Sequence, residues 1–184
     1  AGVGGMLGEA FYYEFSNDYN LYCTDKDVNE KWLNYLNFCD KDNYKSEVKK
    51  FNPDYLFHIG AFTDLEYCEK HKEEAIKTNT HSVITAVEIS NYLKIPLLYI
   101  STAGIFDGLK DFYDEHDLPK PIGVYASSKY EAEKYVLNHC NKYFICRAGW
   151  MMGGGPKKDK KFIQKMIKQI KDGKKELFVV NDKF

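Results

Sequence analysis

The sequence predicts an α/β protein whose parallel sheet is doubly wound and Rossmann-like, and three observations support this fold class. Short apolar runs rich in aromatic and β-branched residues alternate with longer charged stretches of helical character, which is typical of βαβ units. A cluster of glycines stands directly before the first helical stretch, as in turns that approach a phosphate. Hydroxyl and acidic side chains follow predicted strands, at the edge where sheets of this class bind ligands.

Short strands and longer helices are expected to alternate along the chain. Two of the strands, those that begin near Tyr55 and Leu97, come just after a proline, which marks the entry into a strand. The helical stretch 66–93 is long for a globular protein, so we expect a break near Lys72. The expected strands are Tyr19–Thr24, Tyr55–Gly60, Leu97–Ser101, Tyr143–Arg147 and Leu177–Val180, and the expected helices are Met6–Phe15, Asp42–Lys50, Glu66–Leu93, Gly123–His139 and Lys161–Asp172.

Charge and cysteine usage exclude several classes of protein. The 26 basic and 27 acidic side chains nearly cancel, so the chain has no positive field that would hold a nucleic acid. No apolar stretch approaches the length of a membrane span. The five cysteines are odd in number, scattered, and in no CxxC or Cys/His cluster, so neither disulfides nor a metal site is indicated. With no signal peptide visible, we expect a cytoplasmic protein with no metal, no nucleic-acid partner and no membrane partner.

The glycine cluster Gly2-Val-Gly-Gly5-Met-Leu-Gly8 contains a GxxGxxG pattern. The first glycine permits a tight turn, the second lets the backbone approach a pyrophosphate, and the third lets the helix pack on the sheet. The N–H groups of the first helical turn would face the phosphates. Because short glycine clusters are common, a plain glycine-rich turn remains an alternative for this pattern taken alone.

A carboxylate stands where a dinucleotide's adenosine ribose would be bound. Seventeen residues after Gly8, the predicted strand over 20–24 ends at Asp25, which could accept hydrogen bonds from the ribose hydroxyls and so favours NAD. The neighbouring Lys26 could pair with a 2′-phosphate, which leaves NADP open. The alternative is that Asp25 and Asp27 are turn residues that follow a strand.

The most informative pattern is Tyr125-Ala-Ser-Ser-Lys129 at the start of a predicted helix. Residues four apart share a helix face, so the Lys129 ammonium can lie near the Tyr125 phenol and lower its pKa. Upstream, Thr102 ends a predicted strand, and its hydroxyl could polarise a carbonyl that Tyr125 protonates while a nicotinamide delivers hydride. An exposed tyrosine and lysine is the alternative for the pattern alone. The glycine cluster, Thr102 and the Tyr125–Lys129 pattern follow one another in this order, and together they favour an NAD(P)-dependent reductase.

With these residues in view, the chain resembles the extended short-chain dehydrogenase/reductases over essentially its whole length, in the branch of the dTDP-4-dehydrorhamnose reductases. The phrase Ile-Phe-Asp-Gly followed by Tyr-x-x-x-Lys is specific to that branch. The segments that carry the resemblance are Gly2 to Gly8, the region of Asp40, Ala61 to Glu69, Ser101 to Gly108, Tyr125 to Lys129, Arg147 to Trp150 and Val179 to Asp182.

The resemblance implies a role for each matching residue. Thr102 would bind the keto oxygen of a sugar, Tyr125 would donate the proton, and Lys129 would hold the nicotinamide ribose and tune the phenol. Trp150 would line the substrate side, with a core tryptophan as the alternative. The implied cofactor contacts are Gly2, Gly5, Met6 and Leu7 to the pyrophosphate, Asp25 to the ribose, Asp40 to the adenine, and Gly60, Ala61 and Thr63 to the middle of the cofactor.

The function that the resemblance implies is reduction, by NADH or NADPH, of the C4 ketone of a 4-keto-6-deoxy sugar nucleotide such as dTDP-4-dehydrorhamnose. An epimerase or dehydratase of the same superfamily is one alternative, and a non-catalytic regulatory subunit that keeps the cofactor is another. The family's Asp-Tyr pair after the catalytic threonine is replaced by Ala103-Gly104, which argues against a dehydratase and leaves the sugar open. A homodimer is expected by analogy.

Two parts of the family's fold are expected to lie outside this chain. A sheet of this kind begins with a strand that feeds the glycine turn, yet here the glycines come at once. We therefore interpret residues 1–184 as one NAD(P)-binding, Rossmann-like domain of a longer protein that lacks its first strand here. The C-terminal substrate-binding portion is expected beyond Phe184.

Overall fold

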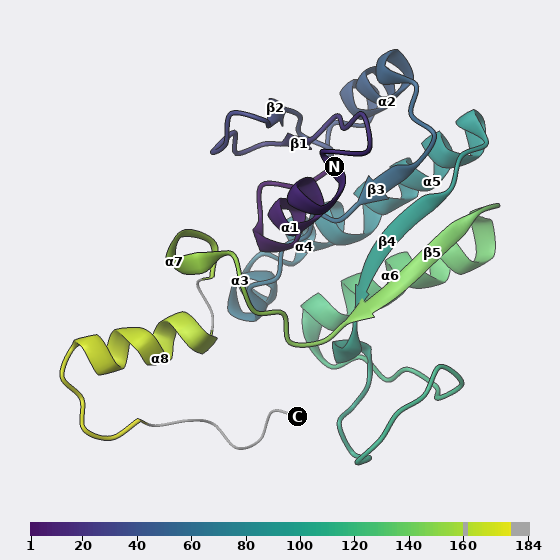
Figure 1. Ribbon diagram of the computed structural model, residues 1–184. Coiled ribbons are helices and arrows are strands. Elements are labelled where there is room, and N and C mark those ends of the chain that lie inside the picture. The colour runs from purple at the N-terminus through teal and green to yellow at the C-terminus, as the bar shows by residue number, and fades with distance from the viewer. Residues whose placement is uncertain (160–161, 178–184) are drawn as a thin grey trace.

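The computed structural model describes residues 1–159 and 162–177 and has the α/β architecture that the sequence predicts (Figure 1). In chain order the elements are α1 (Met6–Phe15), β1 (Thr24–Asp25), β2 (Asn34–Tyr35), α2 (Lys41–Phe51), β3 (Leu56–His58), α3 (Leu65–Lys70), α4 (Lys72–Ile76), the π-helix η1 (Lys77–His81), α5 (Ser82–Leu93), β4 (Leu97–Thr102), the 3₁₀-helix η2 (Ala103–Ile105), α6 (Gly123–His139), β5 (Tyr143–Ala148), α7 (Gly155–Lys158) and α8 (Phe162–Lys171).

The first three residues join two parallel sheets into one layer. Strands β3, β4 and β5 form one sheet and β1 and β2 form the other. The amides of Gly2 and Val3 donate to the carbonyl of Thr24 (2.8 and 3.1 Å), and the Ala1 carbonyl accepts from the amides of Ile59 and Gly60 (3.0 and 3.2 Å). The spatial order is therefore β2, β1, residues 1–3, β3, β4, β5, the order of a dinucleotide-binding sheet.

Helices cover both faces of this layer. Along β4 the side chains of Leu97, Tyr99 and Ser101 point to one face and are buried, and α5 and α6 pack there. Phe57 of β3 points to the other face, where its ring meets Phe11 of α1 with centroids 5.4 Å apart. The sheet is thus doubly wound, with its ligand-binding edge at the carboxyl ends of the strands.

A buried polar cluster beside the core explains one of the histidines. The two ring nitrogens of His58 lie 3.0 Å from the Tyr44 hydroxyl and 3.0 Å from the Ser82 hydroxyl. Burial lowers the pKa of His58 well below its ordinary value, so the ring is neutral and bridges β3, α2 and α5. His58 therefore has a structural role.

The helix predictions agree closely with the structure. Helices α1 and α6 have the predicted bounds, and the long stretch 66–93 breaks at His71, one residue from the predicted break. The second half of that stretch contains the π-helical turn η1, which the sequence did not predict. The last predicted helix, Lys161–Asp172, is observed as α8 from Phe162, and Lys161 lies outside the described residues.

The strand predictions were correct in place but not always in length. Strands β4 and β5 match within one residue. The strand expected at Tyr19–Thr24 is instead the two-residue β1, because only these two residues pair with β2. The strand expected at Tyr55–Gly60 is shorter than predicted and is observed as β3. Strand β2 was not among the expected strands. The expected strand Leu177–Val180 extends outside the described part of the chain.

No helix in residues 1–159 and 162–177 has both the length and the apolar character needed to cross a membrane. In the same residues, no group of three or more His, Cys, Asp or Glu side chains could hold a metal ion. The expected cytoplasmic location stays a prediction.

Candidate functional site

The glycine turn is built by close backbone contacts. Gly2 has a φ of +76°, and a Cβ there would stand 2.2 Å from the Cα of Gly60. A Cβ on Gly8 would stand 2.2 Å from the carbonyl oxygen of Val3, so only glycine lets α1 approach the sheet this closely. Gly5 differs, since no atom lies within 4 Å of the position its Cβ would take. This open side is where a pyrophosphate could approach.

Helix α1 begins at that opening without a side-chain cap. It begins at Met6, and its N-cap, Gly5, makes no side-chain hydrogen bond to the first turn. The first N–H groups of a helix need a partner and attract anions. The Met6 side chain lies against Gly154, in the loop after β5, where an added Cβ would meet Met6 at 3.0 Å. The turn, with Leu7 in the first helical turn, fits a dinucleotide phosphate.

Asp25 lies against the same turn. Its Oδ2 accepts from the Gly4 amide (2.9 Å) and its Oδ1 accepts from the Asp27 amide (3.0 Å). The carboxylate therefore bridges the end of β1 and the glycine turn, which places it beside any ligand held there. The Nζ of Lys26 lies 4.9 Å from the centroid of the Phe62 ring.

Asp40 has a structural role in this chain. It is exposed and caps α2, because its Oδ1 accepts from the Asn43 amide at 3.1 Å. Its contact with an adenine stays a prediction that rests on the resemblance.

The segment after β3 is held by a side chain that the sequence analysis missed. Asn79, buried in η1, accepts from the Phe62 amide (2.8 Å) and donates to the Phe62 carbonyl (3.1 Å). It also donates to the Ser128 hydroxyl of α6 (3.1 Å). These bonds tie the backbone around Gly60, Ala61 and Thr63 to the helix that carries Tyr125. The π-helical turn, invisible to a periodicity search, is the local feature that carries Asn79.

Thr102 and Tyr125 are brought together by the fold. Thr102 ends β4, and its Oγ1 accepts from the Gly104 amide (3.1 Å), which starts η2. The Tyr125 hydroxyl lies near enough to the Thr102 side chain to interact with it. Burial raises the pKa of Tyr125, and the interaction with Thr102 opposes that rise. The expected fall in this pKa is therefore wrong for the structure as described, because removal from water outweighs the other influences.

Lys129 lies one turn after Tyr125 and is buried. Its Nζ is 4.4 Å from the centroid of the Tyr99 ring, and the Tyr99 hydroxyl donates to the Lys129 carbonyl (3.0 Å). Burial lowers the pKa of Lys129 to about 7, while the nearby Glu133 acts to raise it. This lysine can thus change charge near neutral pH.

The start of α6 is fixed by Glu69 of α3, another residue without an assigned role in the sequence analysis. Its Oε1 accepts from the Val124 amide at 2.6 Å, and an added Cβ on Gly123 would meet the same oxygen at 2.8 Å. A carboxylate at a helix N-terminus is favourable. Glu69 therefore helps to place Tyr125, which follows in the first turn.

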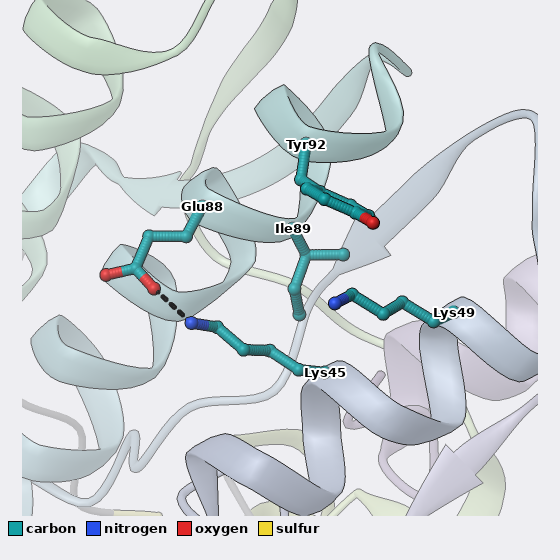
Figure 2. A pocket seen from close by; sticks show the side chains of 5 residues that line it. All are labelled: Lys45, Lys49, Glu88, Ile89 and Tyr92. Atoms are coloured by element: carbon teal, nitrogen blue, oxygen red, sulfur yellow. Dashed lines mark ion pairs between the residues drawn. The ribbon is translucent and has the colours of Figure 1, made fainter.

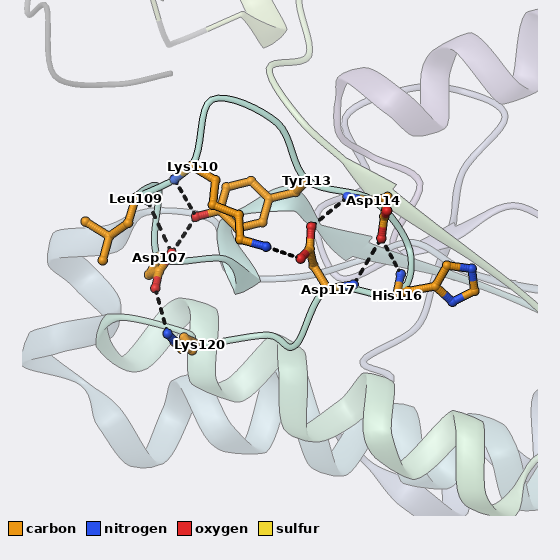
Figure 3. Close-up of polar contacts among 8 residues, drawn as sticks. All are labelled: Asp107, Leu109, Lys110, Tyr113, Asp114, His116, Asp117 and Lys120. Atoms are coloured by element: carbon orange, nitrogen blue, oxygen red, sulfur yellow. Dashed lines mark hydrogen bonds and ion pairs between the residues drawn. The ribbon is translucent and has the colours of Figure 1, made fainter.

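The loop between η2 and α6 connects Thr102 to Tyr125 and is bonded to itself (Figure 3). Asp107 accepts from the Leu109 amide (3.2 Å) and from the Tyr113 hydroxyl, and it pairs with Lys120 at 3.4 Å. Lys110 pairs with Asp117, whose other oxygen accepts from the Asp114 amide at 3.0 Å. These residues line part of a surface hollow.

A second hollow lies away from these groups, between α2 and α5 (Figure 2). Lys45 pairs with Glu88 at 2.6 Å, and the Nζ of Lys49 lies 4.2 Å from the centroid of the Tyr92 ring. These contacts brace α2 against α5.

Trp150 is 53% exposed, and its ring meets the edge of the Phe162 ring of α8, with ring centroids 5.8 Å apart. The core-tryptophan alternative is therefore wrong. Its place after the carboxyl end of β5 leaves it free to contact a substrate.

With this geometry described, comparison with known proteins identifies the family. A family model, the RmlD substrate binding domain, matches residues 1–184. The chain belongs to the RmlD substrate binding domain family. Among solved structures, the dTDP-4-dehydrorhamnose reductase from Yersinia enterocolitica is 35% identical with a TM-score of 0.82, and the alignment covers 94% of this chain and 58% of that one.

Two further relatives of this RmlD-family chain are informative. The dTDP-4-dehydrorhamnose reductase from Bacillus anthracis, solved in complex with NADP, is 29% identical with a TM-score of 0.84 over 96% of this chain and 60% of that one. The methionine adenosyltransferase 2 subunit beta of Danio rerio is 29% identical over 94% of this chain and 53% of its own length. The chain spans about half the length of the curated relatives that it matches.

Proposed function

We propose that this protein is an NAD(P)H-dependent nucleotide-sugar reductase that acts on the C4 ketone of a 4-keto-6-deoxy sugar nucleotide such as dTDP-4-dehydrorhamnose. One observation carries the proposal: Thr102 at the end of β4 and Tyr125 in the first turn of α6 interact through their side chains, with Lys129 one helical turn further on. This group stands at the same edge of the sheet as the glycine turn. The reductases among the relatives support the reaction class.

The chain's own groups suit a dinucleotide. The amides that begin α1 and the open side of Gly5 would take the pyrophosphate, and the Asp25 carboxylate would accept from ribose hydroxyls. Residues Gly60, Ala61 and Thr63 would border the middle of the cofactor. When bound, the reduced nicotinamide supplies hydride to the carbonyl carbon.

The proton that completes the reduction would come from Tyr125. Thr102 would donate a hydrogen bond to the keto oxygen and so stabilise the negative charge that develops there. Tyr125 would pass its phenolic proton to that oxygen, which yields the hydroxyl, and would then regain a proton from solvent. The Lys129 ammonium would favour the phenolate in this step. The two residues that follow Thr102, Ala103 and Gly104, are small, so neither would place a large side chain beside a substrate bound to Thr102.

The test follows NADH and NADPH oxidation by the full-length protein with a panel of 4-keto-6-deoxy sugar nucleotides. We expect Tyr125→Phe to lower kcat by at least about 10²-fold, as for loss of a general acid. The matched control is Tyr130→Phe on the same helix, whose ring faces Lys134 with the Nζ 5.1 Å from the centroid. Oxidation that survives Tyr125→Phe, or a wild-type protein that binds the cofactor and reduces no sugar of the panel, would overturn the proposal.

A second candidate function is a non-catalytic, cofactor-binding regulatory subunit. The likeness to a methionine adenosyltransferase subunit beta over nearly the whole chain favours it. A partner enzyme that copurifies, together with cofactor binding and no sugar-dependent oxidation, would establish it. The expected homodimer stays a prediction, which the solution mass of the purified protein tests.

A further inference from the structure

Helix α6 carries a third titratable group in line with Tyr125 and Lys129. Glu133 lies one turn after Lys129 and is 1% exposed, while Lys129 is 3% exposed. Residues four apart on a helix lie on the same face, so a buried carboxylate and a buried ammonium lie one turn apart on one face of α6. Burying either charge costs free energy unless another group compensates that charge.

Arg147 of β5 compensates Glu133. Its Nη2 donates to Oε1 (2.7 Å), and its Nε lies 3.2 Å from Oε1 and 3.4 Å from Oε2. The Arg147 guanidinium also lies over the Phe106 ring, with its carbon 5.4 Å from the centroid. Glu133 thus pairs with Arg147 and also acts on Lys129 through space, and the three charges sum to about +1 when all are ionised.

We propose that Glu133 is a positioning residue that keeps the Lys129 ammonium charged inside the site, against its burial and against the like charge of Arg147. The inference rests on the proposed function, since the charged form is the one that would hold the nicotinamide ribose and favour the Tyr125 phenolate. It assigns to the pair Glu133–Arg147 a task beyond joining α6 to β5.

The groups around Lys129 support this assignment. Tyr99 of β4 faces it with its ring, and burial holds the pKa of Tyr99 well above its ordinary value, so Tyr99 brings no charge. His58 of β3 interacts with Lys129 and is neutral, because burial lowers its pKa. Tyr125 is protonated near neutral pH, since burial raises its pKa. Of these neighbours, Glu133 is the group that acts to raise the pKa of Lys129.

The charge count predicts opposite effects of two substitutions. Glu133→Gln leaves Lys129 and Arg147 without a carboxylate, which raises the local charge to about +2, whereas Arg147→Gln lowers it to about 0. Lys129 should lose its proton at lower pH in the first variant and at higher pH in the second. An ion pair that served stability alone would weaken the fold in both variants without moving this titration in opposite directions.

The experiment measures the dissociation constants of NADH and NADPH by nicotinamide fluorescence, from about pH 6 to about pH 9.5, in the full-length protein. We expect the pH at which binding weakens to fall by about one unit in Glu133→Gln and to rise in Arg147→Gln. A one-unit fall makes binding up to about tenfold weaker at pH values above both midpoints. Glu131→Gln, which changes an exposed carboxylate on the same helix, should leave the curve unchanged.

Superimposable curves for wild type and Glu133→Gln, or shifts in the same direction for both variants, would overturn the inference. Should Glu133→Gln fail to fold, Glu133→Asp and Arg147→Gln carry the test, and an Arg147→Gln curve that is unshifted or moved to lower pH overturns it. Failure of the proposed function is separable, since it shows as cofactor binding without sugar reduction. A wild-type protein that binds neither NADH nor NADPH would overturn both.

Discussion

Gly2 and Gly60 meet backbone to backbone, so that a Cβ on Gly2 would stand 2.2 Å from the Cα of Gly60. The contact joins the glycine turn to the residue after β3. Because Gly2 also has a φ of +76°, Gly2→Ala adds both a clash and backbone strain. We expect it to lower the free energy of unfolding by at least about 2 kcal/mol, measured by chemical denaturation.

Gly5→Ala separates binding from folding. The added Cβ meets no atom within 4 Å and the backbone has an ordinary φ of −83°, so stability should change by no more than about 0.5 kcal/mol. The methyl group would stand where a pyrophosphate approaches, and we expect NADPH to bind at least about tenfold more weakly. Unchanged affinity in titrations of the folded variant would contradict the proposed phosphate site.

Thr102→Val keeps the size of the side chain and removes its hydroxyl. We expect kcat for sugar reduction to fall by about 10²-fold or more, since the developing negative charge on the keto oxygen loses a donor. Thr102→Ser keeps the hydroxyl and the acceptor for the Gly104 amide, so it should retain activity within about tenfold. Equal activity of the valine and serine variants in steady-state assays would remove Thr102 from the reaction.

Asp25→Ser tests the choice between the two cofactors. A serine can still accept from the Gly4 amide, as Asp25 does at 2.9 Å, but it no longer repels a 2′-phosphate. We expect the ratio of NADPH affinity to NADH affinity to rise at least about tenfold, which corresponds to about 1.4 kcal/mol. Asp27→Ser alters an exposed neighbour and should leave the ratio unchanged. A fall in the ratio would place the ribose elsewhere.

Acid should weaken the fold through His58. Burial holds the pKa of His58 well below 6.5 in the folded chain, so below about pH 6.5 the unfolded chain binds a proton that the folded chain does not. The free energy of unfolding should then fall by up to about 1.4 kcal/mol per pH unit from this residue as the pH is lowered. Lys129, whose folded pKa is about 7, is charged in both states there and adds little.

Denaturation curves between about pH 5 and about pH 7 check this slope. His58→Gln should flatten it, and His116→Gln, in an exposed loop position, should leave it as in the wild type. A wild-type slope retained in His58→Gln would assign the acid sensitivity to other groups.

Local signals account for the elements that the sequence predicted well. Helix α6 has the predicted bounds, and a four-residue spacing places Tyr125 and Lys129 on one face whatever packs against it. Strand lengths were less predictable, because β1 is a strand only where β2 pairs with it. The exposure of Trp150 was not predictable from the sequence either, since it depends on residues far from Trp150 along the chain.

The sequence by itself determined the α/β class, the glycine turn, and the order of Thr102, Tyr125 and Lys129, because these follow from residue types at short spacings. Only the tertiary structure decided that Thr102 meets Tyr125 and that Glu133 is buried beside Lys129 with Arg147 as its partner. The reason is physical: hydrogen bonds and the cost of burying charge depend on distances between separate elements, and packing sets those distances.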